Sequence, residues 1–334
     1  MLQYIDLACY GRWIANTYKL KDMQKDISSA PVRMIAVDMD GTLLGSDGHV
    51  SARNLAALHA AERAGIEVVV ATGRRHCYAM RQLRGLDLNE ENALVSSNGT
   101  VTRTLGARLL ERTLMQPDAA RRLCAHMDEF RNALVITFDR TGENGEDARG
   151  ALVVEDLEEL NGSISRWMAA NEPYISHVAP IERALEGEAP IQMMICGTIE
   201  RMRTAEARLL DHPGVCAVGA DSALDAEIAL HRTEYPERNL SIVDILPAGC
   251  SKGAALLRLA ARRGLGAGEI LAIGDNWNDL SMLEMAGHRV LMGNAPDDLK
   301  QEAAERGWAV GRRHDEDGVA EAIEAVMAET PVKA

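Results

Sequence analysis

Residues Ile35 to Leu44 read IAVDMDGTLL, an apolar run that ends in two aspartates spaced two residues apart. An apolar run that is followed by a turn-forming glycine predicts a strand buried in a sheet. Residues i and i+2 of a strand share a face, so Asp38 and Asp40 are expected to point the same way and to repel each other. The sequence therefore predicts that a nearby cation compensates the two charges.

The segments that follow this strand alternate between helix-like and strand-like patterns. They are helix-like 51–65 and 74–86 with strand-like 66–72 and 93–97, and later helix-like 251–264 and 278–287 with strand-like 269–275 and 288–293. This alternation predicts an α/β fold, in which a doubly wound parallel sheet of the Rossmann-like kind is flanked by helices. Continuous apolar runs such as IEVVVA are typical of strands that are buried on both faces.

The chain between these two stretches has a different rhythm of short helix-like and strand-like segments. It predicts a separate α+β domain, residues 104–247, inserted into a core made of residues 34–103 and 248–334. Residues 1–33 mix aromatic, apolar and basic side chains. They are expected to be an extension that packs on the core or is poorly ordered, with a helix for a partner or a membrane surface as the alternative.

Composition argues against several classes of partner. The 334 residues include 36 Lys and Arg against 50 Asp and Glu, a net charge of −14 that is a poor match to nucleic acid or to an anionic membrane. The six cysteines are scattered without a C-x-x-C pair, which is typical of a reducing compartment. No stretch approaches about 18 consecutive apolar residues. A soluble, cytoplasmic protein is therefore expected.

Polar residues follow each predicted strand of the core. Because ligands bind at the carboxyl ends of the strands in a doubly wound sheet, these residues are candidates for one common site. They are Asp38, Asp40, Thr72, Gly73, Arg74, Ser97, Asn98, Gly99, Asp275, Asn278 and Asp279. Each of them alone fits a turn or a helix cap, but four polar strand ends in one sheet favour a shared ligand.

A calcium-binding loop is one alternative, because it also carries acidic residues at alternate positions. Counted from Asp38, that loop requires glycine at the sixth position and glutamate at the twelfth, where this chain has Leu43 and His49. The segment GDNWNDL fails the same test at Trp277. Neither stretch is predicted to be such a loop.

Two carboxylates with different tasks account for these residues better. One would act as a nucleophile and the other as a general acid and base, while Mg²⁺ held by Asp38 and Asp275 would offset their charges. A carboxylate that attacks phosphorus forms an aspartyl-phosphate, and donors are then needed around the phosphoryl oxygens. Thr72, the backbone amides near Gly73, and Lys252 at the start of a helix are the candidate donors.

Four motifs carry a resemblance to a known family. DMDGTLL, ATGR, SKG and GDNWNDLSML occur in this order and resemble the signature motifs of the haloacid dehalogenase (HAD) superfamily, specifically of its Cof-type phosphatases. The segments LMGNAPDDLKQEA and DEDGVAEAIE are similar to the C-terminal pattern of that branch, so the resemblance spans about 34–327. It implies a HAD core with an α/β cap domain, for substrate specificity, inserted between the second and third motifs.

The resemblance also implies roles for single residues. Asp38 would be the nucleophile and Asp40 the general acid and base. Mg²⁺ would be bound by side-chain oxygens of Asp38 and Asp275 and by the backbone carbonyl of Asp40, while Asp279 would orient the lysine or a metal-bound water. The residues that would hold the phosphoryl group are Thr72, Gly73, Lys252 and Asn278. Those implied on the substrate side are Arg74 and Asn98.

These inferences predict a magnesium-dependent phosphatase, a phosphoric monoester hydrolase, that acts on a small phosphorylated metabolite such as a sugar phosphate, a nucleotide or a cofactor phosphate. Two alternatives stay open: a phosphomutase that uses the same aspartyl-phosphate, and a non-catalytic sensor of a phosphorylated ligand. Several polar residues of the insert are interpreted as surface or structural groups. They are Glu143, Asp147, His177, His231 and Arg232.

Overall fold

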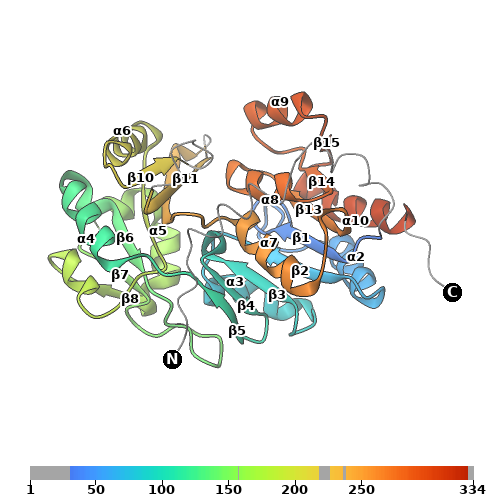
Figure 1. The fold of residues 1–334 in the computed structure, drawn as a ribbon, viewed down its shortest axis with the longest axis horizontal. Helices are drawn as coiled ribbons and strands as arrows, with labels where there is room; N and C mark the ends of the chain where they lie inside the picture. The colour runs from blue at the N-terminus through green and yellow to red at the C-terminus, as the bar shows by residue number, and fades with distance from the viewer. Residues whose placement is uncertain (1–30, 157, 218–225, 236–237, 330–334) are drawn as a thin grey trace.

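The computed structural model describes residues 31–156, 158–217, 226–235 and 238–329, which form two β-sheets with packed helices. Figure 1 shows two bodies side by side, one in blue, cyan, orange and red and the other in green and yellow. The predicted extension at 1–33 lies outside the described residues except for its last three. In the described part of the chain, no helix is long and apolar enough to span a membrane.

Eight strands form the first sheet, in the order β15-β14-β13-β1-β2-β3-β4-β5. They are β1 (Met34–Asp38), β2 (Glu67–Ala71), β3 (Ala93–Ser96), β4 (Val101–Thr104), β5 (Leu109–Arg112), β13 (Ile270–Gly274), β14 (His288–Leu291) and β15 (Ala309–Val310). The strands from β15 to β3 in this order are parallel, whereas β4 and β5 pair antiparallel at the edge. Every residue of β1 is buried, as expected for a central parallel strand.

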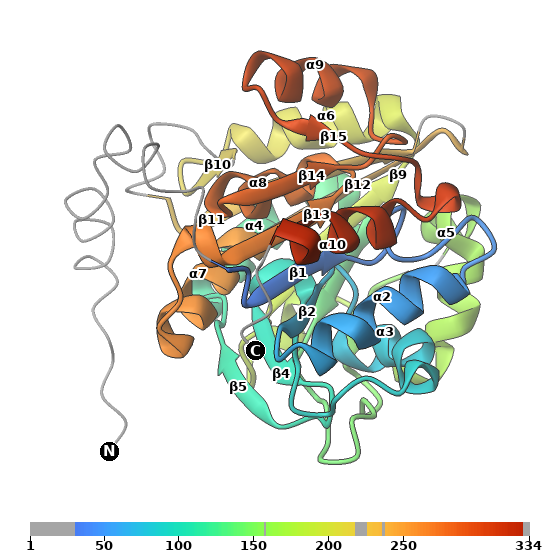
Figure 2. The same cartoon turned by 90° about the vertical axis from the view of Figure 1, so that its right-hand side faces the viewer.

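Helices cover both faces of the first sheet, which confirms the predicted doubly wound α/β fold. One face carries α2 (Ala52–Arg63), α3 (His76–Leu83) and α10 (Gly318–Glu329), and the other carries α7 (Lys252–Arg263), α8 (Leu280–Met285) and α9 (Asp297–Glu305). Side chains of β1 alternate between the two hydrophobic clusters: Ile35 and Val37 face the first set of helices, Met34 and Ala36 the second. Figure 2 shows α10 lying beside α2, in front of β1. We call this body the core.

Seven strands form the second sheet, in the order β10-β11-β12-β9-β6-β7-β8. They are β6 (Leu134–Thr137), β7 (Leu152–Val154), β8 (Ile175–His177), β9 (Gln192–Gly197), β10 (Val215–Ala217), β11 (Ile228–Tyr235) and β12 (Leu240–Pro247). Helices α4 (Pro117–His126) and α6 (Ile199–Leu210) pack on one face, and α5 (Glu158–Asn171) packs on the other. We call this body the cap.

The chain passes from the core to the cap after β5 and returns between β12 and α7. Since β5 pairs with β4 in the first sheet, sheet membership puts the start of the insert after Arg112 and not at residue 104, where the sequence predicts it. The reason is local, because β4 and β5 read VTRT and LLER, which contain no apolar run that predicts a core strand. At the other end β12 ends at Pro247, next to the predicted boundary at 248.

Helix α3 begins later than the sequence predicts. The helical pattern starts at residue 74, but Arg75 has extended backbone angles, φ −65° and ψ 154°, and the first helical residue is His76. Arg74 and Arg75 therefore belong to the loop after β2, at the carboxyl edge of the sheet where ligands bind.

Candidate active site

A buried lysine joins two aspartates at this edge of the core. Lys252, the first residue of α7, is fully buried, and its Nζ donates to Asp38 Oδ1 at 2.5 Å and to Asp279 Oδ1 at 2.6 Å. Asp38 ends β1 and Asp279 lies in the turn after the neighbouring strand β13. The helix starts at Lys252 because the Ser251 hydroxyl accepts the backbone N–H of Ala254 and caps it.

A third buried aspartate, Asp275, directly follows β13. Its Oδ1 accepts from the Thr42 hydroxyl at 2.8 Å, and its Oδ2 accepts from Asn294 Nδ2 at 3.4 Å. Gly41 has a φ of +80°, and a Cβ at this position would clash with Asp275 Oδ2. The turn after β1 thus needs glycine both for its backbone conformation and for the approach of the carboxylate.

The carboxylates in this cluster outnumber the lysine that faces them. Carboxylate oxygens of Asp38, Asp275 and Asp279 lie within 4.8 Å of one another. Burial, followed by the charge of Asp279, raises the pKa of Asp38 to about 7; burial and the charge of Asp38 also raise the pKa of Asp275. Burial would lower the pKa of Lys252, but Asp279 and Asp38 raise it above its ordinary value. This excess of buried negative charge, carried by oxygen ligands, fits a hard divalent cation.

Asp279 is the least available of the three to a metal. Its Oδ1 is taken by Lys252, and its Oδ2 accepts the backbone N–H groups of Asp275 and Asn276 at 2.9 and 3.1 Å. These contacts suit a residue that orients the lysine. They leave oxygens of Asp38 and Asp275 as the better donors for a cation, which is the pair that the sequence predicts.

The expected repulsion between Asp38 and Asp40 is not the main charge effect in the site. The Asp40 carboxylate accepts two hydrogen bonds from Arg74, from Nε at 2.7 Å and from Nη2 at 2.5 Å. Asp279 contributes more than Asp40 to the raised pKa of Asp38. The Asp40 side chain is also 44% exposed, against 6% for Asp38. The two aspartates therefore have different surroundings: Asp38 is buried and paired with Lys252, whereas Asp40 is partly exposed to solvent and paired with Arg74.

The loops after β2, β3 and β13 bring the other predicted residues together. The backbone N–H of Asn98 donates to the carbonyl of Thr72 at 3.1 Å, and Asn278 Nδ2 donates to Asn98 Oδ1 at 3.5 Å. A Cβ on Gly73 would lie 3.2 Å from the Asn98 amide. Thr72, Gly73, Asn98 and Asn278 thus form one connected set at the carboxyl edge of the core sheet.

The cap adds buried polar groups next to this set. Asp244 of β12 accepts a hydrogen bond from Asn98 Nδ2 at 2.8 Å and lies directly opposite His231 of β11. Burial raises the pKa of Asp244 to about 7 and lowers that of His231 to about 4. Burial raises the pKa of Tyr235, at the end of β11, and the negative charges of the core aspartates raise it further. Two cap strands therefore face the core site.

Sequence reasoning missed several of these residues, although some carried a signal. Asn294, whose Nδ2 also donates to the Gly41 carbonyl at 2.8 Å, follows β14 and obeys the strand-end rule that identified the others. Asp244 is the only acid in the apolar run LSIVDILP, and a lone acid in a buried strand points to a partner. For Tyr235 the sequence offers no such signal.

Comparisons with known proteins agree with the fold and the motifs. A family model described as haloacid dehalogenase-like hydrolase matches residues 35–323. The 5-amino-6-(5-phospho-D-ribitylamino)uracil phosphatase YwtE of Bacillus subtilis is 29% identical, over 89% of this chain and 98% of its own. The HMP-PP phosphatase of Escherichia coli is 27% identical, over 81% of this chain and 87% of its own. A haloacid dehalogenase-like hydrolase structure from B. subtilis, at 25% identity, has a TM-score of 0.66 and covers 88% of this chain and 99% of that chain.

The family match spans nearly the whole described chain and includes all four motifs. Those motifs carry the buried lysine, its aspartates and the loops around them, so the resemblance and the geometry lead to the same residues. The predictions of an enzyme and of its superfamily are both confirmed. The chain belongs to the haloacid dehalogenase-like hydrolase family.

Proposed function

We propose that this hydrolase is a magnesium-dependent phosphatase that acts on a small phosphorylated metabolite through an aspartyl-phosphate on Asp38. The observation that carries the proposal is the buried Lys252, held between Asp38 and Asp279. Burying three ions is costly, and apolar residues would stabilise the fold at least as well, so the cluster is better explained by chemistry than by stability. Both named relatives are phosphatases, which supports the reaction class.

In the proposed reaction, a carboxylate oxygen of Asp38 attacks phosphorus while the bond from phosphorus to the leaving oxygen breaks. Lys252, 2.5 Å from Asp38, favours the charged carboxylate that the attack requires. Charge spreads over the three equatorial phosphoryl oxygens, which need donors that are already in place. The proposed donors are Lys252, the Thr72 hydroxyl, the Gly73 amide and Asn278.

Asp40 is the proposed general acid and base. It gives a proton to the leaving oxygen in the first half-reaction and takes one from water in the second, when that water releases phosphate from Asp38. Its exposure to solvent fits a group that must exchange protons with substrate and water. Arg74, with two hydrogen bonds to its carboxylate, fixes the direction in which Asp40 points.

The residues that would hold Mg²⁺ are Asp38 and Asp275 through side-chain oxygens and Asp40 through its backbone carbonyl. When bound there, the ion supplies positive charge that offsets the repulsion between these carboxylates and the substrate phosphate. Asn294 and Thr42 hold the Asp275 carboxylate in place for this task.

The cap is proposed to exclude water and to select the leaving group. Asp244, His231 and Tyr235 are three polar cap residues that lie near the core site. They suit a leaving group that carries hydrogen-bonding groups, such as a sugar phosphate, a nucleotide or a cofactor phosphate.

The test is release of inorganic phosphate from a panel of such esters, with and without Mg²⁺. Turnover is expected with Mg²⁺ and should stop with a chelator or in Asp38→Asn, whereas Asp297→Asn, which changes a fully exposed aspartate, should keep wild-type turnover. An isomerised ester without free phosphate would indicate a phosphomutase. Phosphate release by a folded Asp38→Asn protein would contradict the proposed nucleophile.

A further inference from the structure

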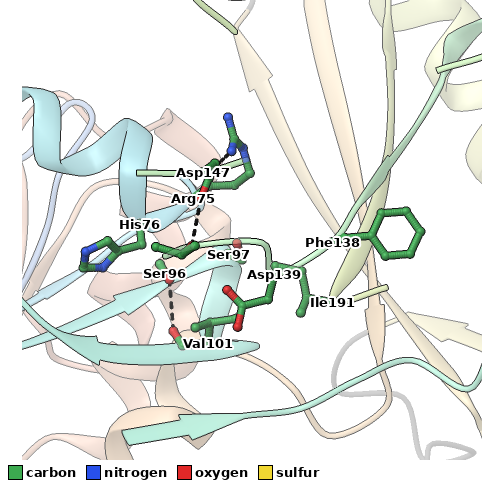
Figure 3. A pocket seen from close by; sticks show the side chains of 10 residues that line it. Arg75, His76, Ser96, Ser97, Val101, Phe138, Asp139, Asp147 and Ile191 are labelled. Carbon is green, nitrogen blue, oxygen red and sulfur yellow. Dashed lines mark hydrogen bonds and ion pairs between the residues drawn. The ribbon is translucent and has the colours of Figure 1, made fainter. Parts of the chain in front are cut away.

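Arg75 is a second arginine in the loop after β2, and it reaches from the core into the cap. Its side chain is only 7% exposed and forms an ion pair with Asp147, which is 3% exposed. Its Nη2 donates to Asn171 Oδ1 at 2.5 Å, and its guanidinium carbon lies 5.4 Å from the centre of the Tyr174 ring. Figure 3 shows Arg75 and Asp147 directed at each other. All of these partners belong to the cap.

This contact is a buried part of the wider interface between the core and the cap. The neighbouring pair Arg84–Glu146 has side chains that are 51% and 38% exposed, so solvent screens it. Burial lowers the pKa of Arg75 to about 10, because desolvation disfavours the charged guanidinium. A buried guanidinium therefore depends on its carboxylate partner, and Asp147 is itself held by the Thr141 hydroxyl at 2.8 Å.

The space beside this contact is too small to be a substrate site. A cavity of about 10 Å³ lies between the two bodies, lined by His76 and Ser97 of the core and by Asp139 and Asp147 of the cap, among others (Figure 3). That volume holds a single water molecule at most. The core and the cap are thus in close contact around Arg75, and the contact serves the protein itself and not a ligand.

The loop that carries Arg75 also carries the proposed phosphate donors. Arg74 N donates to Thr72 Oγ1 at 3.1 Å, and the Arg74 carbonyl accepts from Ser97 N at 2.9 Å. Gly73 lies between Thr72 and Arg74 in the chain, and the Arg74 side chain donates a hydrogen bond to the Asp40 carboxylate. These bonds connect Arg74 to Thr72 and to the neighbouring loop, and Arg75 is the next residue in the chain, so a displacement of Arg75 is expected to shift the groups that face the phosphate.

We propose that Arg75 is a positioning residue that couples the cap to the phosphate-binding loop. When the cap is docked, Asp147 and Asn171 fix Arg75 and thereby fix Thr72, Gly73 and the arginine that aims Asp40. When the cap moves away, the loop loses this support. The inference rests on the proposed phosphatase function for its kinetic consequence, but the structural coupling can be measured without it.

The kinetic test compares Arg75→Gln, Asp147→Asn and the double variant. Each single change is expected to lower kcat/KM by about 10²-fold and to weaken inhibition by inorganic phosphate, because misplaced groups lose rate steeply. Because both residues act through one contact, the kcat/KM of the double variant should be within about twofold of that of the less active single variant. Arg84→Gln, in the same interface but exposed, is the matched control and should stay within about twofold of wild type.

Hydrogen exchange tests the coupling independently of the reaction. Asp147→Asn, a change in the cap, is expected to speed exchange of the amides of residues 72–76 in the core. If no ester is hydrolysed but this exchange is faster, the proposed function fails while the coupling stands. Unchanged exchange at 72–76, or variants that unfold at lower temperature but keep wild-type kcat/KM and phosphate inhibition, would overturn the coupling.

Discussion

Without divalent metal, the stability of this protein should fall as the pH rises from about 5 to about 8, and Asp38 is one of the buried carboxyl groups responsible. Burial raises its pKa from an ordinary value of 3.8 to about 7. In the unfolded chain the carboxyl therefore loses its proton near pH 4, whereas in the folded protein it keeps the proton until about pH 7. The folded state binds more protons in this window, so its stability is full below the unfolded pKa and is lost as the pH rises through the folded one.

The size of the effect follows from the two pKa values. Each pH unit between them corresponds to about 1.4 kcal/mol, so ionising Asp38 lowers the free energy of unfolding by about 4 kcal/mol at pH 8. About 2.7 kcal/mol of this loss falls between pH 5 and pH 8, so at about 2 °C per kcal/mol for a chain of this length the Tm should fall by about 5 °C over that range. Lys252 adds no slope here, because its raised pKa places its titration above this range.

The assay is thermal unfolding in a chelator across this pH range, for wild type and Asp38→Asn. Asparagine does not ionise, so the Tm of wild type relative to the variant should drop by about 5 °C between the two ends of the range. Titrations that do not depend on Asp38 cancel in this difference. Added Mg²⁺ should restore the wild type at pH 8 more than the variant, because a ligand of the folded state stabilises it. Parallel curves for the two proteins would refute the electrostatic argument for a cation.

Three other predictions follow from single contacts. Gly41→Ala should raise the Mg²⁺ concentration needed for half-maximal phosphate release by about tenfold or more, because the added Cβ would meet the Asp275 carboxylate. Gly48 also has a positive φ, but a Cβ there would have no neighbour within 4 Å. An equal effect of Gly48→Ala would therefore count against this reasoning. Arg74→Gln should lower kcat by about 10²-fold for an alkyl phosphate and much less for p-nitrophenyl phosphate, whose leaving group needs no proton. Equal losses of kcat on both substrates would show that Arg74 has no role in proton transfer. Leu58→Ala, which empties a fully buried position in α2, should cost about 2–5 kcal/mol in urea unfolding while leaving kcat unchanged.

The core strands could be predicted because each one is a short apolar run with a polar residue at its end. Strands β1, β2, β3 and β13 all have this form, and their order in the sheet follows from the helices between them. The β4–β5 hairpin could not be predicted, since its strands are short and half polar and gain their structure from pairing with β3. For that reason the sequence predicts the start of the insert at residue 104, before β5, whereas the sheet of the core continues to Arg112.

The candidate site was predictable in its membership but not in its pairings. The strand-end rule finds Asp38 and Asp275 because it depends only on topology. The pairing of Asp40 with Arg74 depends on how two neighbouring loops leave the sheet, and no local pattern encodes that direction. The contact of Asp244 with the core is further out of reach, because it depends on how the cap docks.

The short connection from β12 to α7 has a consequence for protein engineering. Asp244, which contacts the core, and Lys252, which holds Asp38, are separated by only the end of one strand and a four-residue link, 248–251. The cap therefore cannot be exchanged as a free module at this end. A chimera that takes its cap from a relative has to join the two chains after Arg112 and before Asp244. Lys252 and the end of β12 that precedes it then both come from this protein.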